Sequence, residues 1–279
     1  ISEDTEEKTW RPHPLVLSGS PTRRWHLIEF ASSITQERGI LTIATVLTSQ
    51  NVRAEKKSGM EGDIREYMAK RGVQGLVRVI SAPDSFEGAK RMVDYYGLGA
   101  LVPNTIILGD SENLELREKY CDMIRYFYQL KRNVVIIHDN KEKHFGERKT
   151  IDVWWGGLKG NGGLMILLTY LLQSSVRWHD ADVTIKMVVK DEKAIPGIGD
   201  NLSDIMRNIR IEAKTELIVS KGRDCRSGRF SCSRTNFRMI KRALPHSPPF
   251  AAQLFTCSVL PCFTNMPEYQ SRKILDYAP

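Results

Sequence analysis

The stretch IDVWWGGLKGNGG, Ile151 to Gly163, joins an apolar segment with two adjacent tryptophans to five glycines within eight residues. Its apolar part is typical of a strand that is covered on both faces, with Trp154 and Trp155 pointing to opposite sides. The glycines lead into the predicted helix LMILLTYLLQ. Gly162 and Gly163 either present backbone N–H groups to an anion or allow a tight turn with close helix–sheet packing. Because no Lys, Ser or Thr is placed to hold a phosphate, we favour packing.

The same order of strand and helix extends outward from this stretch. Five apolar runs that predict strands come before it: HPLVLSGS, ILTIATVLT, LVRVISAP, NTIILG and NVVIIHD. Four helical patterns lie between these runs: PTRRWHLIEFASSITQERG, GDIREYMAKRG, DSFEGAKRMVDYYG and SENLELREKYCDMIRYFYQLKR. Pro21 and Gly39 are suited to open and close the first helix, and Asp84 and Ser111 to cap later ones. Short buried strands alternating with helices predict an α/β fold with mostly parallel sheets flanked by helices.

The predicted fold divides into two consecutive α/β units. The polar segment NKEKHFGERK interrupts the alternation, and TIDVWW, ADVTIKMVV and TELIVS are the apolar runs that resume it. We expect a first subdomain over residues 1–145 and a second over 146–220. Residues 221–279 form a basic tail rich in Cys and Pro, in which AAQLFTCSVL fits either a strand or a helix and the rest shows no clear period.

The composition restricts the classes of function. The formal net charge is +8, but residues 221–279 carry ten Lys and Arg against three Asp and Glu. The basic character therefore belongs to the tail, and we expect no nucleic-acid partner. The tail also holds Cys225, Cys232, Cys257 and Cys262, whose spacings do not match common zinc sites. The chain begins with a polar segment instead of Met, so we treat it as an excised fragment.

Common catalytic motifs are absent from the sequence. It contains no phosphate-binding G-x4-G-K-[ST], no G-x-S-x-G, no H-E-x-x-H and no G-x-G-x-x-G after the first strand. The remaining candidates are titratable groups at predicted strand ends, namely Asp110, His138, Asp139 and Asp152. An enzyme using these carboxylates remains one hypothesis, whereas turn and capping roles are the simpler interpretation. We therefore assign no catalytic residue and no metal ligand.

Several long segments resemble the cytoplasmic C-terminal domain of cation-chloride cotransporters, in a form of prokaryotic type. They are IDVWWGGLKGNGGLMILLTYLLQSSVRWHDADVTIKMVV, YYGLGALVPNTIILG, RPHPLVLSGSP and FASSITQERGILTIATVL. The resemblance covers residues 10–220, and its structural markers are Pro103, Asn104, Asp152, Trp154, Trp155, Gly162 and Gly163. Asn161 stands where the family usually has Asp before the paired glycines, and the tail does not follow the family pattern.

The resemblance implies a non-catalytic regulatory and dimerisation domain at the cytoplasmic face of the cell membrane, in an electroneutral cation-chloride cotransporter. The implied partners are a second copy and the transmembrane transport domain of the same polypeptide. The high apolar density around Trp154 to Leu172 makes this stretch the candidate contact between the two copies. It also implies a fold like that of universal stress proteins, although their phosphate-binding glycine signature is missing after Gly109.

No cofactor is assigned, but ATP is a possible weak ligand. Small residues at Ser18, Gly19, Ser20 and Gly109 allow backbone N–H groups to approach a phosphate near the start of the first helix. Arg23 and Arg24 lie in its first turn and favour an anion there. The alternative function is a soluble nucleotide-binding protein of the stress type.

Overall fold

The computed structural model describes residues 10–49, 52–110, 113, 115–139, 144–155, 162–189, 197, 212–219, 237–241 and 254–259. The chain divides into two compact units. The break lies between Ile137 and His138, a few residues before the predicted boundary at residue 145. Within the described residues, no helix is long and apolar enough to cross a lipid bilayer.

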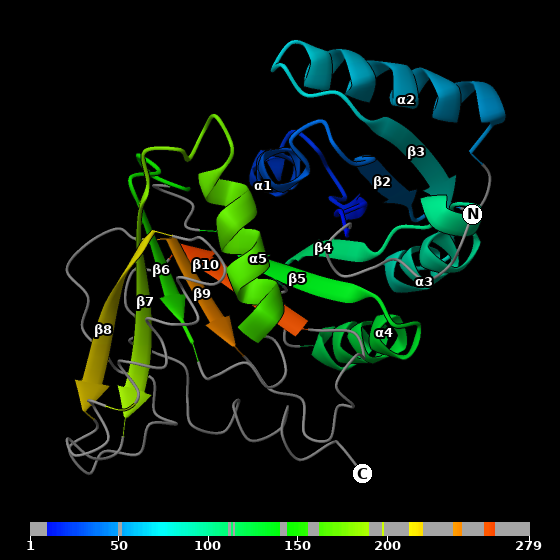
Figure 1. The fold of residues 1–279 in the computed structure, drawn as a ribbon. Helices are drawn as coiled ribbons and strands as arrows, with labels where there is room; N and C mark the ends of the chain where they lie inside the picture. The colour runs from blue at the N-terminus through cyan, green and yellow to red at the C-terminus, as the bar shows by residue number, and fades with distance from the viewer. Residues whose placement is uncertain are drawn as a thin grey trace. The chain divides into compact units, whose positions relative to one another are not determined.

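Unit 1 is a parallel sheet covered by helices on both faces (Figure 1). Its strands are β1 (Pro14–Leu17), β2 (Thr42–Leu47), β3 (Leu76–Ser81), β4 (Thr105–Gly109) and β5 (Asn133–His138), in the spatial order β3-β2-β1-β4-β5. Its helices are α1 (Trp25–Thr35), α2 (Ala54–Ala69), α3 (Ser85–Tyr95) and α4 (Arg117–Gln129), with a 3-10 turn η2 at Gly99–Leu101. The predicted strands before residue 139 are thereby confirmed as one parallel sheet.

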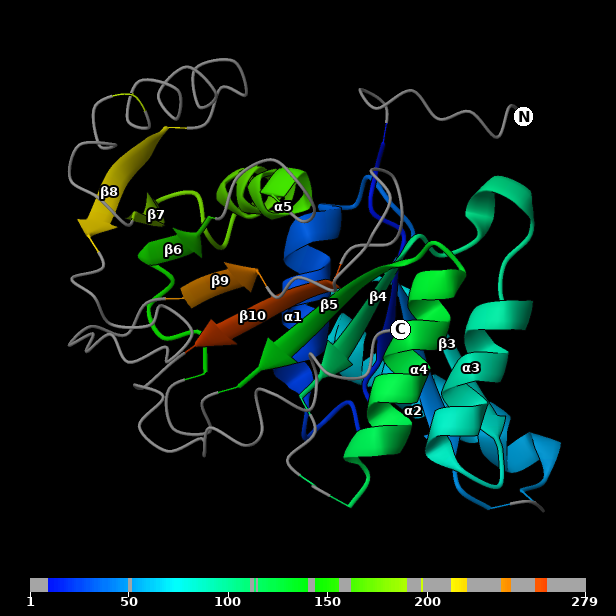
Figure 2. The same cartoon turned by 90° about the horizontal axis from the view of Figure 1, so that it is seen from below.

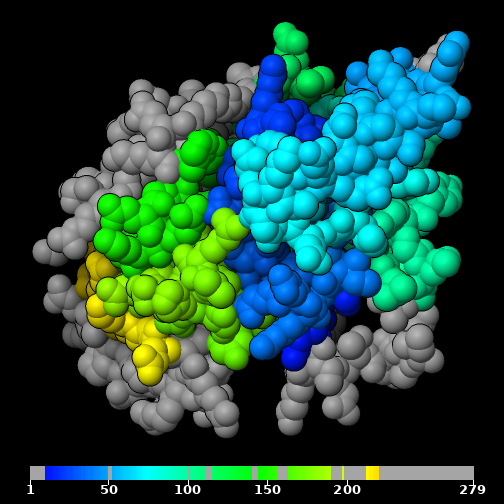
Figure 3. Space-filling view, turned by 90° about the horizontal axis from the view of Figure 1, so that it is seen from above, coloured from blue at the N-terminus to red at the C-terminus, as the bar shows by residue number. Residues whose placement is uncertain are grey.

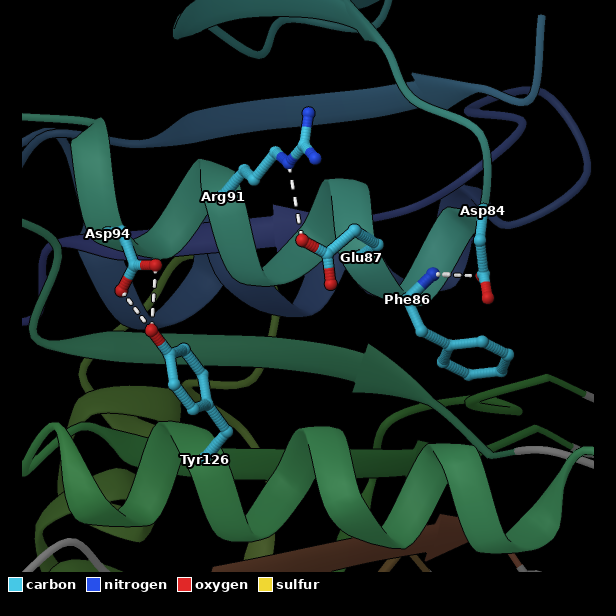
Figure 4. A network of polar contacts seen from close by, with 6 residues as sticks. All are labelled: Asp84, Phe86, Glu87, Arg91, Asp94 and Tyr126. Carbon is cyan, nitrogen blue, oxygen red and sulfur yellow. Dashed lines mark hydrogen bonds and ion pairs between the residues drawn. The ribbon is translucent and has the colours of Figure 1, made fainter.

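Local sequence determines several helix ends. The side chain of Asp84 accepts a hydrogen bond from the Phe86 N–H at 2.8 Å, which confirms it as the N-cap of α3 (Figure 4). By contrast, α1 ends where Gln36 adopts a left-handed conformation, so Gly39 does not close this helix. A glycine is needed at position 39 because the backbone of Pro12 lies very close, and a Cβ on residue 39 would collide with the Pro12 carbonyl oxygen. Ser111 lies outside the described residues.

Helices α3 and α4 are joined by a polar contact on their shared side. The Tyr126 hydroxyl lies 2.7 Å from both carboxylate oxygens of Asp94 (Figure 4). Within α3, Arg91 pairs with Glu87 one turn earlier at 3.3 Å. The hydrogen bond to Asp94 raises the pKa of Tyr126. This contact fixes α3 against α4 at the solvent-exposed side of the helix layer.

Helix α2 differs most from the prediction. It begins at Ala54, eight residues before the predicted start, and Met68 is its buried residue. Figure 3 shows it standing out at the surface of unit 1. It covers the edge strand β3, where the Glu61 carboxylate accepts a hydrogen bond from the Val79 N–H at 2.9 Å. A charged side chain thereby satisfies one backbone donor of β3, an edge strand of this sheet.

Unit 2 continues the parallel arrangement. Its described strands are β6 (Thr150–Trp154), β7 (Asp182–Val189), β8 (Ala213–Val219), β9 (Phe237–Lys241) and β10 (Leu254–Val259), and among the described residues its helix is α5 (Gly162–Gln173). Strand β6 pairs in parallel with β7 and with β9, and β7 pairs in parallel with β8. Strand β10 pairs antiparallel with β9. The predicted strands over residues 150–155, 181–189 and 215–220 are confirmed.

The tail contributes more regular structure than its pattern predicted. Strands β9 and β10 both lie within residues 221–279, and the ambiguous segment AAQLFTCSVL contains β10. The predicted helix DNLSDIMRNIRI lies outside the described residues, as do Cys225, Cys232 and Cys262. The predicted fold class, two α/β units with mostly parallel sheets and flanking helices, is nevertheless confirmed.

Candidate functional site

Three small or polar residues lie in a row where β2, β1 and β4 end. Leu17 is level with Ala44 on β2 and with Leu108 on β4. Continuing this register by one residue places Ser18 beside Thr45 and Gly109. Residues at one level of adjacent parallel strands share a face of the sheet. A Cβ built on Gly109 points at Arg24 and Leu27, so the row faces α1.

Two hydroxyls of this row lack partners. Ser18 is fully buried and Thr45 is 6% exposed. Neither Ser18 Oγ nor Thr45 Oγ1 has a hydrogen-bond partner within the described part of the chain. A buried hydroxyl without a partner costs about 1–3 kcal/mol. Such groups are expected where a ligand or an ordered water supplies the missing hydrogen bond.

A hollow of about 350 Å³ opens beside the row. It is lined by Gly19, Ser20 and Pro21 after β1, by Thr45, Val46 and Leu47 of β2, and by Met60, Asp63 and Ile64 of α2. Two predicted site residues, Gly19 and Ser20, therefore lie in its wall. Gly19 adopts a φ of 65°, which favours glycine. The volume lies at the lower end of the range of small-molecule pockets, and the mainly apolar wall with a few polar groups suits such a ligand.

The charge around Gly109 favours an anion. The Arg24 guanidinium covers this glycine, with Nη1 3.2 Å from the position of a built Cβ. The first turn of α1 contains no acidic residue, so the positive end of the helix is not neutralised there. The Tyr120 hydroxyl donates a hydrogen bond to the Gly109 carbonyl at 2.9 Å. Burial, together with the nearby Asp110 charge, strongly raises the pKa of Tyr120 and keeps its hydroxyl neutral.

The predicted strand-end groups of β4 and β5 lie on neighbouring strands. Asp110 directly follows β4, and its N–H donates to the Ile137 carbonyl of β5 at 3.0 Å, one residue before His138. The Asp139 carboxylate lies 2.9 Å from Nδ1 of His144. Asp152 is buried on β6 and pairs with a lysine, which supports the structural interpretation.

The pairing of Asp152 spans three strands of unit 2. Lys186 Nζ on β7 lies 3.2 Å from Asp152 Oδ2 and 3.2 Å from Glu216 Oε2 on β8. Burial alone lowers the pKa of Lys186, but the two carboxylates and their hydrogen bonds raise it above its usual value. Loss of one partner from a buried pair leaves an uncompensated charge. Lys186 on β7 therefore links a carboxylate of β6 to a carboxylate of β8.

The marker Asn104 holds together the strand starts of unit 1. Its amide Nδ2 donates to the Arg11 carbonyl at 2.8 Å, and its Oδ1 accepts from the His13 N–H at 2.9 Å. The Asn104 carbonyl accepts from the Asn133 N–H at 2.9 Å. In turn, His13 Nδ1 accepts from the Ile40 N–H at 3.0 Å. Asn104, which follows the buried marker Pro103, thus links the starts of β1, β4 and β5.

The tryptophan and glycine markers lie in unit 2. Trp154 ends β6 and is partly exposed, whereas Trp155 is 6% exposed and donates its backbone N–H to the Lys186 carbonyl at 2.8 Å. Gly162 and Gly163 begin α5. No described atom lies within 4 Å of a Cβ built on Gly163. Close packing therefore does not explain Gly163, contrary to our preferred interpretation.

The sequence patterns did not predict the site residues that come from β2, α2 and α4. Thr45 was visible as a polar residue within an apolar run, but its position beside Ser18 depends on strand register. Asp63 on α2 lines the hollow. No local sequence motif predicts that α2 lies beside the strand ends. Tyr120 likewise reaches Gly109 from α4.

The architecture defines a two-unit α/β domain with a candidate ligand hollow at the strand ends of unit 1. A sequence model of Solute carrier family 12 matches residues 24–143 and 136–227, and the chain belongs to this family. The match covers unit 1 from the start of α1 and extends through β8 of unit 2.

Related proteins agree with this assignment. Cation-chloride cotransporter 1 from Arabidopsis thaliana is 23% identical over 242 residues, which cover 79% of this chain and 24% of the plant protein. The chain thus spans about a quarter of the length of that relative. The crystal structure of the cytoplasmic domain of a prokaryotic cation chloride cotransporter matches with a TM-score of 0.60 and 13% identity, covering 89% of this chain and 95% of that one. This match shows a shared fold.

A universal stress protein from Archaeoglobus fulgidus DSM 4304 is a more distant match. Its TM-score is 0.47 at 10% identity, over 76% of this chain and 78% of that one.

Proposed function

We propose that this chain is the cytoplasmic regulatory and dimerisation domain of an electroneutral cation-chloride cotransporter. The match of Solute carrier family 12 across both units carries the proposal. The fold likeness to the cytoplasmic domain of a prokaryotic cation chloride cotransporter supports it over nearly the whole chain. In this proposal the domain lies at the cytoplasmic face of the cell membrane, on the same polypeptide as the transport domain.

A non-catalytic role is consistent with the engagement of the strand-end carboxylates. Asp152 is bound to a lysine, and Asp139 lies beside His144. The unpartnered hydroxyls of Ser18 and Thr45 are better suited to holding a ligand than to attacking one, because neither has a base within hydrogen-bonding distance among the described residues.

The proposed homodimer uses unit 2. Most apolar side chains predicted as contacts are buried within the chain, including Leu164 to Ile166 and Leu168. Tyr170 on α5 and Val176 just after it remain 44% and 88% exposed. We therefore place the contact at these two residues, in accordance with the usual two-fold association of like surfaces.

Light scattering across a concentration series tests this arrangement. We expect the mass of a dimer for the 279-residue chain, and a shift toward monomer for Tyr170→Asp combined with Val176→Asp. The matched control is Tyr95→Asp combined with Leu98→Asp, which introduces the same two charges at exposed positions of unit 1. A strict monomer in the high-micromolar range would contradict the dimer.

Weak nucleotide binding is a second candidate function. The unpartnered hydroxyls, the adjacent hollow and the arginine over Gly109 favour it. The absence of a phosphate-binding lysine and of the stress-protein glycine signature limits the affinity that we expect for ATP. We expect a dissociation constant in the high-micromolar range or weaker, about 5–6 kcal/mol of binding free energy.

Isothermal titration with ATP, with and without magnesium, measures this affinity. Gly19→Val should abolish it, because a β-branched residue is strained at this positive φ and narrows the hollow. Gly72→Val is the control, since Gly72 has a similar φ of 70° and does not line the hollow. Binding in the low-micromolar range that is lost only in Gly19→Val would make the domain a nucleotide sensor. No detectable heat at millimolar ATP would remove this function.

A further inference from the structure

The strand starts of unit 1 form a surface of distinct chemistry, which we call the amino edge. All neighbouring strands of this sheet pair in parallel, so the segments that precede them meet at one edge. These segments are residues 10–13, 36–41, 70–75, 96–104 and 130–132. The hollow beside Gly19 lies at the opposite edge, where the strands end.

Basic side chains predominate at the amino edge. Within the described residues of these segments, the bases are Arg11, Arg38, Lys70, Arg71, Lys131 and Arg132, against one acid, Glu37. Lys70 pairs with Glu66, and Arg71 stacks on Tyr67 with its guanidinium carbon 3.8 Å from the ring centroid. Arg11, Arg38 and Lys131 are exposed. The segments at the opposite edge carry similar numbers of acids and bases, so the positive charge is a property of this edge.

Apolar side chains project from the same edge. Tyr95 is 84% exposed, Leu98 85% and Leu101 57%. They lie at the end of α3 and in the segment that follows it, and residues 96–104 contain no charged residue. Figure 2 shows this part of the chain standing out from the body of unit 1.

The projecting segment is held at both ends. Gly97 has a φ of 98°, and a Cβ there would lie 2.7 Å from the Cα of Val102, so the turn is tight. Asn104 closes the segment and binds the backbone of Arg11. The Asn104 side chain therefore holds the backbone of the exposed Arg11 beside the apolar segment.

We propose that the amino edge of unit 1 binds the surface of an anionic phospholipid bilayer. Tyr95, Leu98 and Leu101 enter the boundary between headgroups and acyl chains, and Arg11, Arg38 and Lys131 contact lipid phosphates. Apolar insertion combined with a basic patch is the usual arrangement of a peripheral membrane surface.

An acidic protein partner fits these observations less well. A stable protein interface buries about 800 Å² on each partner with a packed apolar centre. Three side chains on one narrow projection do not form such a centre, whereas a fluid bilayer accepts separate insertions. The proposal extends the function above and does not depend on dimerisation, which is placed in unit 2.

Vesicle co-sedimentation of the full 279-residue chain tests the proposal. The vesicles are phosphatidylcholine alone or phosphatidylcholine mixed with phosphatidylserine. We expect at least about tenfold stronger partitioning to the mixed vesicles, reduced at high salt because exposed charges are screened. Lys131→Glu and Leu98→Ser should each weaken partitioning several-fold. The matched controls, Lys56→Glu on α2 and Leu116→Ser just before α4, alter exposed positions away from the amino edge and should not.

The variants separate this surface from the basic tail, which is unchanged in all of them. If the mixed vesicles bind wild type, Lys131→Glu and Leu98→Ser equally, the amino edge is not the lipid surface and the proposal fails. Equal binding to neutral vesicles would also overturn it. If soluble polyglutamate captures wild type as strongly as the vesicles do, and Leu98→Ser leaves that capture unchanged, an acidic protein partner replaces the bilayer.

Discussion

At the scale of single residues, Trp155 and Trp178 illustrate how unit 2 is packed. Both indole rings are buried, and Trp178 meets the Phe145 ring edge to face with centroids 5.6 Å apart. Aromatic rings of this size bury on the order of 200 Å² each. Trp155, one of the markers that the resemblance predicted, and Trp178 therefore both fill the interior of unit 2.

Replacing Trp155 with alanine should be strongly destabilising. A large-to-small change at a buried aromatic residue leaves a cavity, and we expect a loss of ~3–5 kcal/mol in the free energy of unfolding. Chemical denaturation measures the loss, with Tyr170→Ala as a partly exposed control. A thermal midpoint within about a degree of wild type would show that the ring does not support the fold.

His13 makes the stability of unit 1 dependent on pH. Its Nδ1 accepts the Ile40 N–H, which requires neutral imidazole, and burial lowers its pKa below 6.5. Because the folded pKa is lower than the unfolded one, this contribution is complete above pH 6.5 and is lost as pH falls through the folded pKa. His13→Asn retains an acceptor that does not titrate. The test compares stability at pH 7.5 and 5.5, roughly the range around a histidine pKa. Over this range the free energy of unfolding of the wild type should fall more than that of His13→Asn. An equal fall in both proteins would contradict the role of His13 as a neutral acceptor.

At the scale of elements, two helices that contain glycine should respond oppositely to the same substitution. Gly88 in α3 faces β2, and a Cβ there would collide with Val46 and lie 2.9 Å from Ala82 Cβ. Gly59 in α2 has no described atom within 4 Å of a built Cβ. Gly59→Ala should stabilise the protein by about 0.5–1 kcal/mol through helix propensity.

Gly88→Ala should instead destabilise the protein, because overpacking costs about 1–3 kcal/mol and exceeds the gain in propensity. Urea unfolding of both variants measures the two signs. Stabilisation by both substitutions would mean that α3 does not pack closely on β2.

The elements also show what sequence patterns determine. Asp84 was predicted as a cap because capping depends on neighbours in the chain, and the apolar runs predicted the strands because burial on both faces leaves little room for polar residues. The row of Ser18, Thr45 and Gly109 depends on register between distant strands, which no local pattern contains. The start of α2 was missed because Gly59 and Gly62 and an exposed surface remove the helical period.

At the scale of the whole molecule, both units are built on mostly parallel strands, but their buried polar residues differ in their contacts. In unit 1 a hollow lies at the strand ends, and its wall includes Thr45, whose hydroxyl has no hydrogen-bond partner among the described residues. In unit 2, β6 carries a buried carboxylate bound to Lys186. Ligand binding is therefore our proposal for unit 1, and the contact between two copies is our proposal for unit 2. The chain matches about a quarter of its plant relative, so transport itself is a proposal for a longer polypeptide.

Chloride-dependent cation uptake by cells that express the complete polypeptide containing this chain tests the central claim most directly. We predict electroneutral uptake that requires chloride, and a changed rate at equal surface expression when residues 10–219 are deleted. Absence of chloride-dependent uptake, or a rate unaffected by the deletion, would contradict the assignment of this chain as a regulatory domain of a cation-chloride cotransporter.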